Sequence, residues 1–323
     1  MWRTNRRSLI VFVACFCSVL SFAELATRFW ESGAAVGEEA TYSRKLSQIR
    51  GQQFDLLLLG DSTAHQGLVP ERLTDGSVFN AALQSGSGIV AERLAQSVAA
   101  APKQLIYAGI LPEVADTWEP QRHERALMTL SERARWSPGT ADLVLSGLSH
   151  FYLRRNQVRA ALLAVTQRSR TRPRVASNGE SPLGWLPQPS HELAPTERDA
   201  LARDKMDLWF RTPSTGEVRL AALRATLRVW PGSTERILLL MPMSSSIRKR
   251  LAMRPEAPQL HARWQTLAAT TQSTLLDCMS AMPDARFHDD DHLDAEGARA
   301  FSDELGVWLR DHQQYPAGCT QAR

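Results

Sequence analysis

The sequence carries little net charge and no repeated pattern, and each of these absences excludes a class of protein. Its 38 Lys and Arg residues stand against 34 Asp and Glu residues, so the formal net charge is only +4 over 323 residues. A balance this mild argues against a polyanionic partner for the chain as a whole. The sequence shows no internal repeat and no low-complexity segment, which argues against solenoid and repeat architectures.

Cysteine is scarce as well, with four residues in the chain. Cys15 and Cys17 lie in an apolar N-terminal stretch, which leaves Cys278 and Cys319 as the remaining pair. An oxidising compartment would permit these two to bridge and so tie the C-terminal tail to the last predicted strand. The alternative is two unpaired thiols, one buried in that strand and one on the tail, and the sequence leaves both open.

The N-terminus has the pattern of a targeting segment. Arg3, Arg6 and Arg7 precede an apolar stretch over 9–23, which together resemble the charged and apolar regions of an export signal. The stretch is shorter than the roughly 17–25 apolar residues of a spanning helix, and small residues over 21–23 offer a cleavage site. We expect 1–31 to be a signal anchor or a cleaved signal peptide, with a buried amphipathic helix as a third alternative. The amphipathic spacing after Glu24 favours the anchor.

The arginines before the apolar stretch orient the rest of the chain to the outside of the cytoplasmic membrane. We therefore expect a single-pass protein of the bacterial inner membrane with its main domain in the periplasm, or a secreted protein if the signal is cleaved. Residues 32–52 are polar and contain glycine, which is typical of a spacer that lifts a domain off the membrane.

The remainder of the chain is typical of a globular α/β domain. The hydrophobic share is 43% and the charged share 22%, which suits one large domain with an insertion. Alternation with helices, one of them over 89–99, predicts a three-layer α/β/α fold around a five-stranded parallel sheet, in a domain over 53–313 with a tail over 314–323. The strands are predicted from short apolar runs at 54–59, 78–83, 104–111, 236–243 and 274–278.

About 120 residues separate the third and fourth predicted strands, far more than a single crossover helix needs. Apolar residues at helical spacing predict that this insertion, over 115–233, is mostly helical, with a proline-rich irregular loop at 173–196. We expect it to roof the carboxyl edge of the sheet. Seven arginines and no acidic residue lie between 150 and 179, and Arg154, Arg155 and Arg159 in particular suit anionic lipid headgroups or an acidic polysaccharide. A solvated basic face is the alternative, and the export signal argues against nucleic acid.

Two short motifs carry chemistry. Gly60-Asp61-Ser62 follows the apolar run Leu56–Leu59, so Ser62 is predicted at a strand-to-helix turn on the carboxyl edge of the sheet. Near the other end of the chain, Asp289 and His292 stand three residues apart. An imidazole supplies the base that activates a serine hydroxyl, and a carboxylate orients that imidazole, so these three residues predict nucleophilic catalysis.

This pair of motifs resembles the SGNH hydrolase superfamily, also called GDSL-like esterases and lipases, in which Gly-Asp-Ser opens the domain and Asp-x-x-His closes it. The resemblance implies a flavodoxin-like fold over roughly 54–311 and catalytic roles for Ser62, His292 and Asp289. It also implies an oxyanion hole from the backbone N–H groups of Ser62 and Gly86, with Ser85 as the neighbour that would replace Gly86. The family's third donor, an Asn after the third strand, is missing from Gly109-Ile110-Leu111-Pro112-Glu113.

The expected activity is ester hydrolysis or acyl transfer through an acyl-serine intermediate, without a cofactor. Relatives lacking that Asn resemble exported acyl-transfer proteins, so an acylated cell-surface carbohydrate is the expected substrate and a membrane acyl donor protein a further partner. A protein of this fold that binds a polymer or protein partner without catalysis is the alternative.

Other assignments remain open around the two motifs. Asp290 or Asp291 could replace Asp289 as the orienter, and His288, Asp289, Asp291 and His292 could instead hold a divalent metal, although no metal is our assignment. His65 is expected to be a packing residue and Asp61 to stabilise the turn. Asp294 is expected to cap the closing helix, whose apolar face contains Ala298, Phe301, Leu305 and Trp308.

Overall fold

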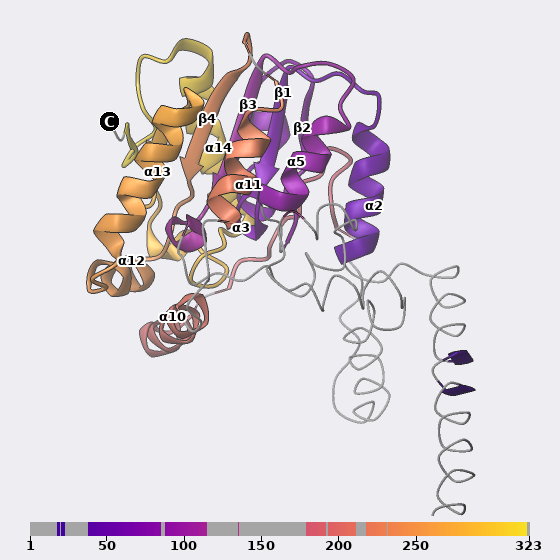
Figure 1. The fold of residues 1–323 in the computed structure, drawn as a ribbon. Coiled ribbons are helices and arrows are strands. Elements are labelled where there is room, and N and C mark those ends of the chain that lie inside the picture. Colours follow the sequence, from indigo (N-terminus) through magenta and orange to yellow (C-terminus); the bar gives the residue numbers. More distant parts are fainter. Residues whose placement is uncertain are drawn as a thin grey trace, which may run out of the picture. The chain divides into compact units, whose positions relative to one another are not determined.

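The computed structural model of the chain describes residues 38–84, 88–114, 179–191, 193–210, 218–230 and 232–321, together with the single positions 18, 19, 21, 22 and 135. By its contacts the chain divides into one unit over 1–40 and 125–176 and a second over 41–124 and 177–323. The second unit holds the whole sheet (Figure 1). Among the helices that are described, none is both long and apolar enough to cross a membrane.

Several expectations fall outside the described residues. They are the signal segment over 1–31 apart from four positions, the roof over 115–178 apart from position 135, and the possible oxyanion donors Ser85 and Gly86. The basic residues Arg154, Arg155 and Arg159 belong to the same stretch.

A single sheet of six strands runs through the second unit in the order β2-β1-β3-β4-β5-β6. The first five strands are parallel, whereas β6 pairs antiparallel with β5. The mixed α/β architecture with parallel strands is as predicted, but the predicted count of five strands is wrong. The strands are β1 (Leu56–Gly60), β2 (Val78–Asn80), β3 (Gln104–Gly109), β4 (Glu235–Leu240), β5 (Thr274–Asp277) and β6 (Thr320–Gln321).

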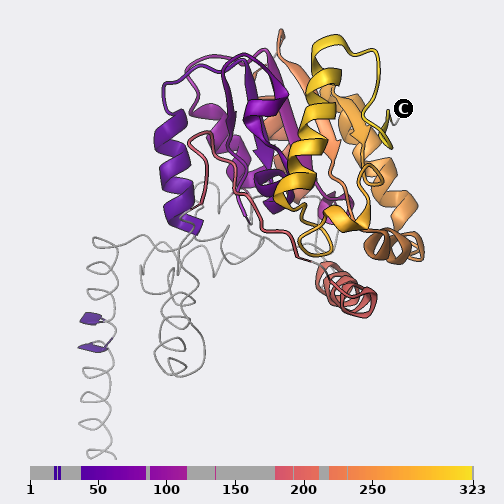
Figure 2. The ribbon, with the colours of Figure 1, turned by 180° about the vertical axis from the view of Figure 1, so that it is seen from behind.

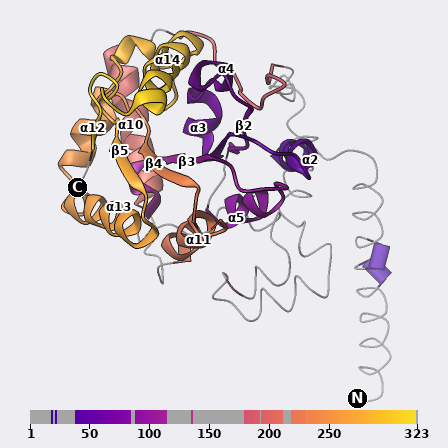
Figure 3. The same ribbon diagram turned by 90° about the horizontal axis from the view of Figure 1, so that it is seen from above.

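Helices cover both faces of this sheet, which explains why its central strands are apolar at nearly every position. Leu56–Leu59 of β1 are fully buried, and so are Ile237–Leu240 of β4. Figure 3 shows the two layers of helices on opposite sides of the sheet. One layer contains α3 (Ser62–Gly67), α4 (Pro70–Leu73) and α14 (Ala295–Asp311), and the other contains α5 (Gly88–Gln96), α11 (Val218–Leu227) and α13 (Ala257–Thr271).

The closing helix α14 has the predicted cap and the predicted buried face. Asp294 is its N-cap, and the carboxylate accepts a hydrogen bond from the Gly297 N–H at 2.7 Å. Its inward face packs on α3 and α4 and contributes to the main core. The buried residues predicted for that face are Ala298, Phe301, Leu305 and Trp308.

The structure differs from the expected spacer, because residues Glu38–Ile49 form the helix α2. Lys45 of this helix is fully buried, and its ammonium donates to the carbonyls of Asn80, Ala82 and Gly184 at 2.8, 2.6 and 2.9 Å. A polar composition suggested an extended linker, but Lys45 finds three buried acceptors, and Tyr42 and Ile49 of the same helix are buried as well, so a mostly polar helix packs on the domain.

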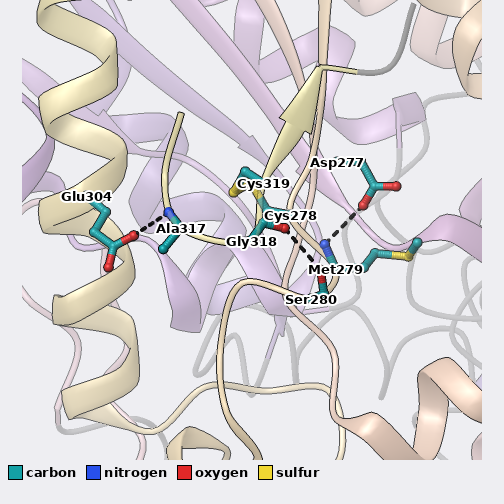
Figure 4. Close-up of a disulfide and its surroundings, with 8 residues drawn as sticks. All are labelled: Asp277, Cys278, Met279, Ser280, Glu304, Ala317, Gly318 and Cys319. Carbon is teal, nitrogen blue, oxygen red and sulfur yellow. Dashed lines mark hydrogen bonds between the residues drawn. A yellow bond between two sulfur atoms is a disulfide. The ribbon is translucent and has the colours of Figure 1, made fainter. Parts of the chain in front are cut away.

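The C-terminal tail also contributes to the fold. Cys278, just after β5, is bonded to Cys319, just before β6, with a Cα–Cα distance of 4.2 Å. Figure 4 shows the bridge together with the hydrogen bond from the Ser280 hydroxyl to the Gly318 carbonyl, at 3.0 Å. Strand β6 is only two residues long and has no apolar run, so the sequence did not predict it; the disulfide holds it against β5.

Between β3 and β4, two described segments of the predicted insertion are helical. They are α10 (Pro195–Trp209), whose first residue lies within the expected loop 173–196, and α11. Helix α10 packs on α12 (Ser245–Ala252), close to the sheet end at which α3 begins (Figure 1). Two short 3-10 turns, η1 (Leu111–Val114) and η2 (Asp284–Arg286), complete the described elements.

The irregular segment 179–191 crosses one face of the domain on its way to α10 (Figure 2). Its backbone N–H at Leu186 donates to the His65 carbonyl of α3 at 3.1 Å, and its Gln188 carbonyl accepts from Ala295 of α14 at 2.9 Å. The Trp185 indole N–H donates to the Gln66 carbonyl at 2.7 Å. This segment therefore links the helix that begins at Ser62 to the helix that follows His292.

Candidate functional site

Ser62 lies at the first position of α3, directly after the β1 strand end. The chain turns out of β1 at Gly60, which adopts a φ of +146° that side-chain-bearing residues rarely adopt. A Cβ at this position would also lie 1.9 Å from the Ala108 carbonyl oxygen of β3, so only glycine fits here. Asp61 then caps the helix, since its Oδ1 accepts hydrogen bonds from the Thr63 N–H at 2.8 Å and from the Thr63 hydroxyl at 2.6 Å. Asp61 thus holds the turn, and Ser62 is presented at the helix start.

The loop between η2 and α14 brings His292 to this serine. The His292 Nε2 atom lies 2.8 Å from Ser62 Oγ, and its Nδ1 atom lies 2.8 Å from Asp289 Oδ2. The other carboxylate oxygen of Asp289 accepts from the backbone N–H groups of Asp291 and His292, at 3.0 and 2.8 Å. Asp289 therefore organises the loop and orients the ring, so the structure brings together the three residues that the sequence nominated.

A second carboxylate also faces the imidazole. Asp291 Oδ1 lies 2.9 Å from His292 Nδ1, nearly as close as Asp289. Burial alone would lower the pKa of His292, but the charge of Asp291 and the hydrogen bonds to Asp289 and Asp291 outweigh it and raise this pKa to about 10. Burial would likewise raise the pKa of Asp289, but the hydrogen bond and charge of His292 keep it below its ordinary range. Both carboxylates therefore favour the protonated form of the His292 ring.

Two cations of α10 contact the same loop, and sequence reasoning missed both. The Lys205 ammonium is hydrogen-bonded to Asp291 and lies 3.4 Å from Asp290 Oδ1. Arg198 is buried and donates to the Asp289 carbonyl at 2.8 Å. Seven residues, about two helical turns, separate these side chains, so they share one face of α10. This spacing of basic residues in a predicted helical insertion was the available signal. Nothing in it identified their partner, the loop over 289–292, which we call the acidic loop.

Asp290 makes no hydrogen bond or ion pair with the imidazole in the described part of the chain, so it is not the orienter. Its side chain is fully buried, and its carboxylate oxygens have no hydrogen-bond partner among the described residues. Burial and the neighbouring charges of Asp291 and Asp289 raise the pKa of Asp290 to about 6, against the opposing effect of Lys205. Its backbone carbonyl accepts from the Ser244 N–H at 3.0 Å, so Asp290 attaches the loop to the start of α12.

The alternative of a metal site is only partly supported by the geometry. Asp289, Asp291 and His292 offer ligand atoms within 4.8 Å of one another, whereas His288 directs its Nδ1 to the Pro189 carbonyl at 2.7 Å. Both ring nitrogens of His292 face protein partners, and Lys205 supplies the positive charge that Asp291 requires. The ligand atoms of these three residues therefore already have protein partners.

His65, one turn after Ser62, belongs to a different buried group. Its Nε2 lies 3.2 Å from Glu180 Oε1, and Glu180 in turn pairs with Arg44 and, at 3.3 Å, with Lys45. Burial, followed by the charges of Lys45 and Arg44, lowers the pKa of His65 well below its ordinary value. His65 is therefore a neutral packing residue, as expected.

The expected oxyanion donors are only partly described. The Ser62 N–H is at the helix start, but Gly86 lies outside the described residues. Where the family has an Asn after the third strand, this chain turns into η1 and buries Glu113. The Glu113 carboxylate accepts from the Tyr107 hydroxyl at 2.5 Å and lies 3.6 Å from Arg219. A carboxylate accepts hydrogen bonds, so Glu113 does not replace the missing donor.

No protein-family model matches the chain, and no curated protein matches it. Among solved structures, the chain is similar to a Streptococcus pneumonia protein provisionally described as a platelet activating factor. The identity is 11% and the TM-score 0.39, over 89% of this chain and 98% of that one. A likeness this distant supports no conclusion about activity.

Proposed function

We propose that this chain is a serine esterase or a related O-acyltransferase that acts through an acyl-Ser62 intermediate. The observation that carries the proposal is the hydrogen-bonded series Ser62, His292 and Asp289, in which both distances are 2.8 Å. Nucleophile and base within hydrogen-bond reach, with the base oriented by a third group, is the arrangement that nucleophilic catalysis requires.

The chemistry follows from these contacts. Neutral His292 accepts the Ser62 hydroxyl proton at Nε2 while Oγ forms a bond to the ester carbonyl carbon, giving a tetrahedral oxyanion. The oxyanion then collapses, the bond to the leaving alcohol breaks, and His292 returns its proton to that alcohol. In the second half, His292 deprotonates a water or an acceptor hydroxyl as its oxygen bonds to the acyl carbon. The bond from that carbon to Ser62 Oγ then breaks, and His292 returns the proton to Oγ. Asp289 stabilises the imidazolium in both halves.

The missing Asn affects whether hydrolysis or acyl transfer is the favoured reaction. Losing one oxyanion donor costs on the order of a hundredfold or more in rate, so a fast free-standing lipase is disfavoured. Transfer of a short acyl group to or from a cell-surface carbohydrate suits a slower enzyme held near its substrate. The N-terminal export pattern supports a site outside the cytoplasm, and so does the disulfide between Cys278 and Cys319, since such bonds persist in oxidising compartments.

The test is covalent labelling of the purified full-length chain. A fluorophosphonate probe and p-nitrophenyl acetate are each applied at pH 7 and pH 9 to wild type and to Ser62→Ala. We expect wild type to be labelled and to release p-nitrophenol, and Ser62→Ala to lose both signals to background. Ser47→Ala, which removes an exposed hydroxyl of α2, is the matched control and retains them. Folded wild type that stays unlabelled at both pH values would overturn the proposal and favour a binding protein of this fold.

A further inference from the structure

The acidic loop contains more carboxylates than serine chemistry needs. One carboxylate orients the base, yet both Asp289 and Asp291 lie within 2.9 Å of His292 Nδ1. The side chain of Asp291 is only 6% exposed, so water screens its charge poorly. This second charge raises the proton affinity of His292 further, and so reduces the fraction of neutral ring that can accept the Ser62 proton.

The compensating charge comes from a distant part of the chain. Lys205 of α10 is separated by 86 residues from Asp291, and its ammonium is hydrogen-bonded to that carboxylate. Of the Lys205 side chain, 24% is exposed, so this ammonium is partly accessible to solvent while it pairs with the buried Asp291 carboxylate. Lys205 lowers the pKa of His292, opposing the two carboxylates.

Helix α10 is held in place to make this contact. Asp199 accepts from the Arg250 guanidinium of α12 through both carboxylate oxygens, at 2.7 Å each. Arg198 donates to the Asp289 carbonyl at 2.8 Å, while Ala202, Met206 and Trp209 are buried on the same helix. Three separate interactions therefore place the Lys205 ammonium at the acidic loop.

We propose that Lys205 is a positioning residue of the candidate site: by pairing with Asp291 it leaves Asp289 as the effective partner of His292, and so couples the insertion to proton transfer at Ser62. The inference rests on the proposed function, which it deepens. It concerns a residue that touches neither Ser62 nor the reacting ester and acts by offsetting the charge of Asp291. The other titratable or charged groups around His292 are Asp61 of the α3 cap, His65 of α3, Arg198 of α10, and Asp289 and Asp290 of its own loop.

The proposal predicts effects of opposite sign for the two members of the pair. In Lys205→Met the uncompensated Asp291 favours the imidazolium, so the rising limb of the pH profile for fluorophosphonate labelling moves up by about one pH unit, and the rate at pH 7 falls about tenfold. In Asp291→Asn the limb moves to lower pH and the rate at pH 7 rises. The double variant returns close to wild type, and Lys205→Arg retains the wild-type profile.

Arg203→Met is the matched control, because Arg203 lies on the same helix with 61% of its side chain exposed and pairs with Asp199, away from the acidic loop. It loses the same charge and leaves the profile unchanged. If Lys205→Met fails to fold, comparison of the double variant with Asp291→Asn alone isolates the effect of Lys205, because neither leaves the carboxylate of residue 291 unpaired.

A second measurement separates this inference from the proposed function. The His292 ring is titrated by NMR in the full-length Ser62→Ala chain, with and without Lys205→Met, which requires no catalysis. We expect the midpoint to rise when Lys205 is replaced. An unchanged midpoint, or a labelling rate that falls equally at every pH, overturns the role of Lys205 even where wild type is labelled. A shifted midpoint in a protein that is never labelled supports Lys205 while the esterase proposal fails.

Discussion

The two halves of the candidate site are held in place in different ways. Ser62 is positioned by its immediate neighbours: Gly60 permits the strand end, and Asp61 caps the helix that Ser62 opens. His292 is positioned by contacts that are distant along the chain. Arg198 and Lys205 of α10 contact its loop, and Ser244 at the start of α12 binds the Asp290 carbonyl.

Because of this difference, the two halves of the site should respond differently to substitutions. A nucleophile held by local geometry stays in place as long as β1 and β3 pair, because a strand end followed directly by a helix cap has few alternative backbone conformations. A base held by a loop between helices responds to whatever moves those helices or changes their charge. We therefore expect substitutions on the serine side to affect stability, and substitutions on the histidine side to affect rate and pH dependence.

The largest effect is expected for Asp289→Asn. The amide removes the acceptor that fixes the His292 tautomer, so labelling and turnover should fall by about 10³–10⁴-fold while the free energy of unfolding changes little. Rates of p-nitrophenyl acetate cleavage and urea unfolding curves measure the two quantities. Asp290→Asn in the same loop is the control and should cost less than about tenfold. Equal losses in both variants would mean that loop folding, not orientation of His292, decides the rate.

Gly60→Ala should produce the largest loss of stability. A methyl group 1.9 Å from the Ala108 carbonyl, at φ +146°, forces β1 and β3 apart, so we expect about 3–5 kcal/mol less stability or no recoverable protein. Gly51→Ala is matched, because Gly51 also has a positive φ of 71° but nothing within 4 Å, and should cost about 1 kcal/mol. Urea unfolding distinguishes them. Similar costs would show that the serine side is less constrained than the geometry indicates.

Removing the disulfide should lower stability by about 4 kcal/mol, since it closes a loop with a sequence separation of 41. The variant pairs Cys278→Ala with Cys319→Ala, and unfolding is followed in urea without reductant. Ser280→Ala, which loses only the hydrogen bond to Gly318, is the control. We expect labelling of Ser62 to change less than severalfold. A loss of labelling as large as that of Asp289→Asn would mean that the tail also positions the acidic loop.

The mildest perturbation is a change of pH, which alters no residue of the wild-type chain. The base must be neutral, and the pKa of His292 is raised to about 10, so the rate should rise with pH up to about 10 and level off above it. Between pH 7 and pH 9 we expect an increase approaching about a hundredfold, after subtraction of the uncatalysed reaction. Stopped labelling time courses in matched ionic strength measure it. A rate already constant above pH 7 would mean that Asp291 does not charge the ring.

Much of the fold was predictable because it depends on local apolar patterns. Five strands were expected near their observed positions, with ends that differ by a few residues, as at 54–59 for β1 (Leu56–Gly60). The cap at Asp294 followed from residue type and spacing in the same way. Strand β6 and helix α2 were missed because neither has an apolar run. One depends on a disulfide, and the other on a lysine whose three acceptors lie far along the chain.

The sequence by itself determined which residues we propose for the chemistry: a serine at a strand end, and a histidine three residues after a carboxylate, are recognisable because short-range spacing governs both motifs. Only the tertiary structure decided that His292 reaches Ser62, that Asp291 joins Asp289 at the ring, and that Lys205 offsets the second charge. The physical reason is range. Backbone turns and caps act over a few residues, whereas the Ser62 hydroxyl is 230 residues from His292 in the chain and the Lys205 ammonium is 86 residues from Asp291, so only folding brings these groups together.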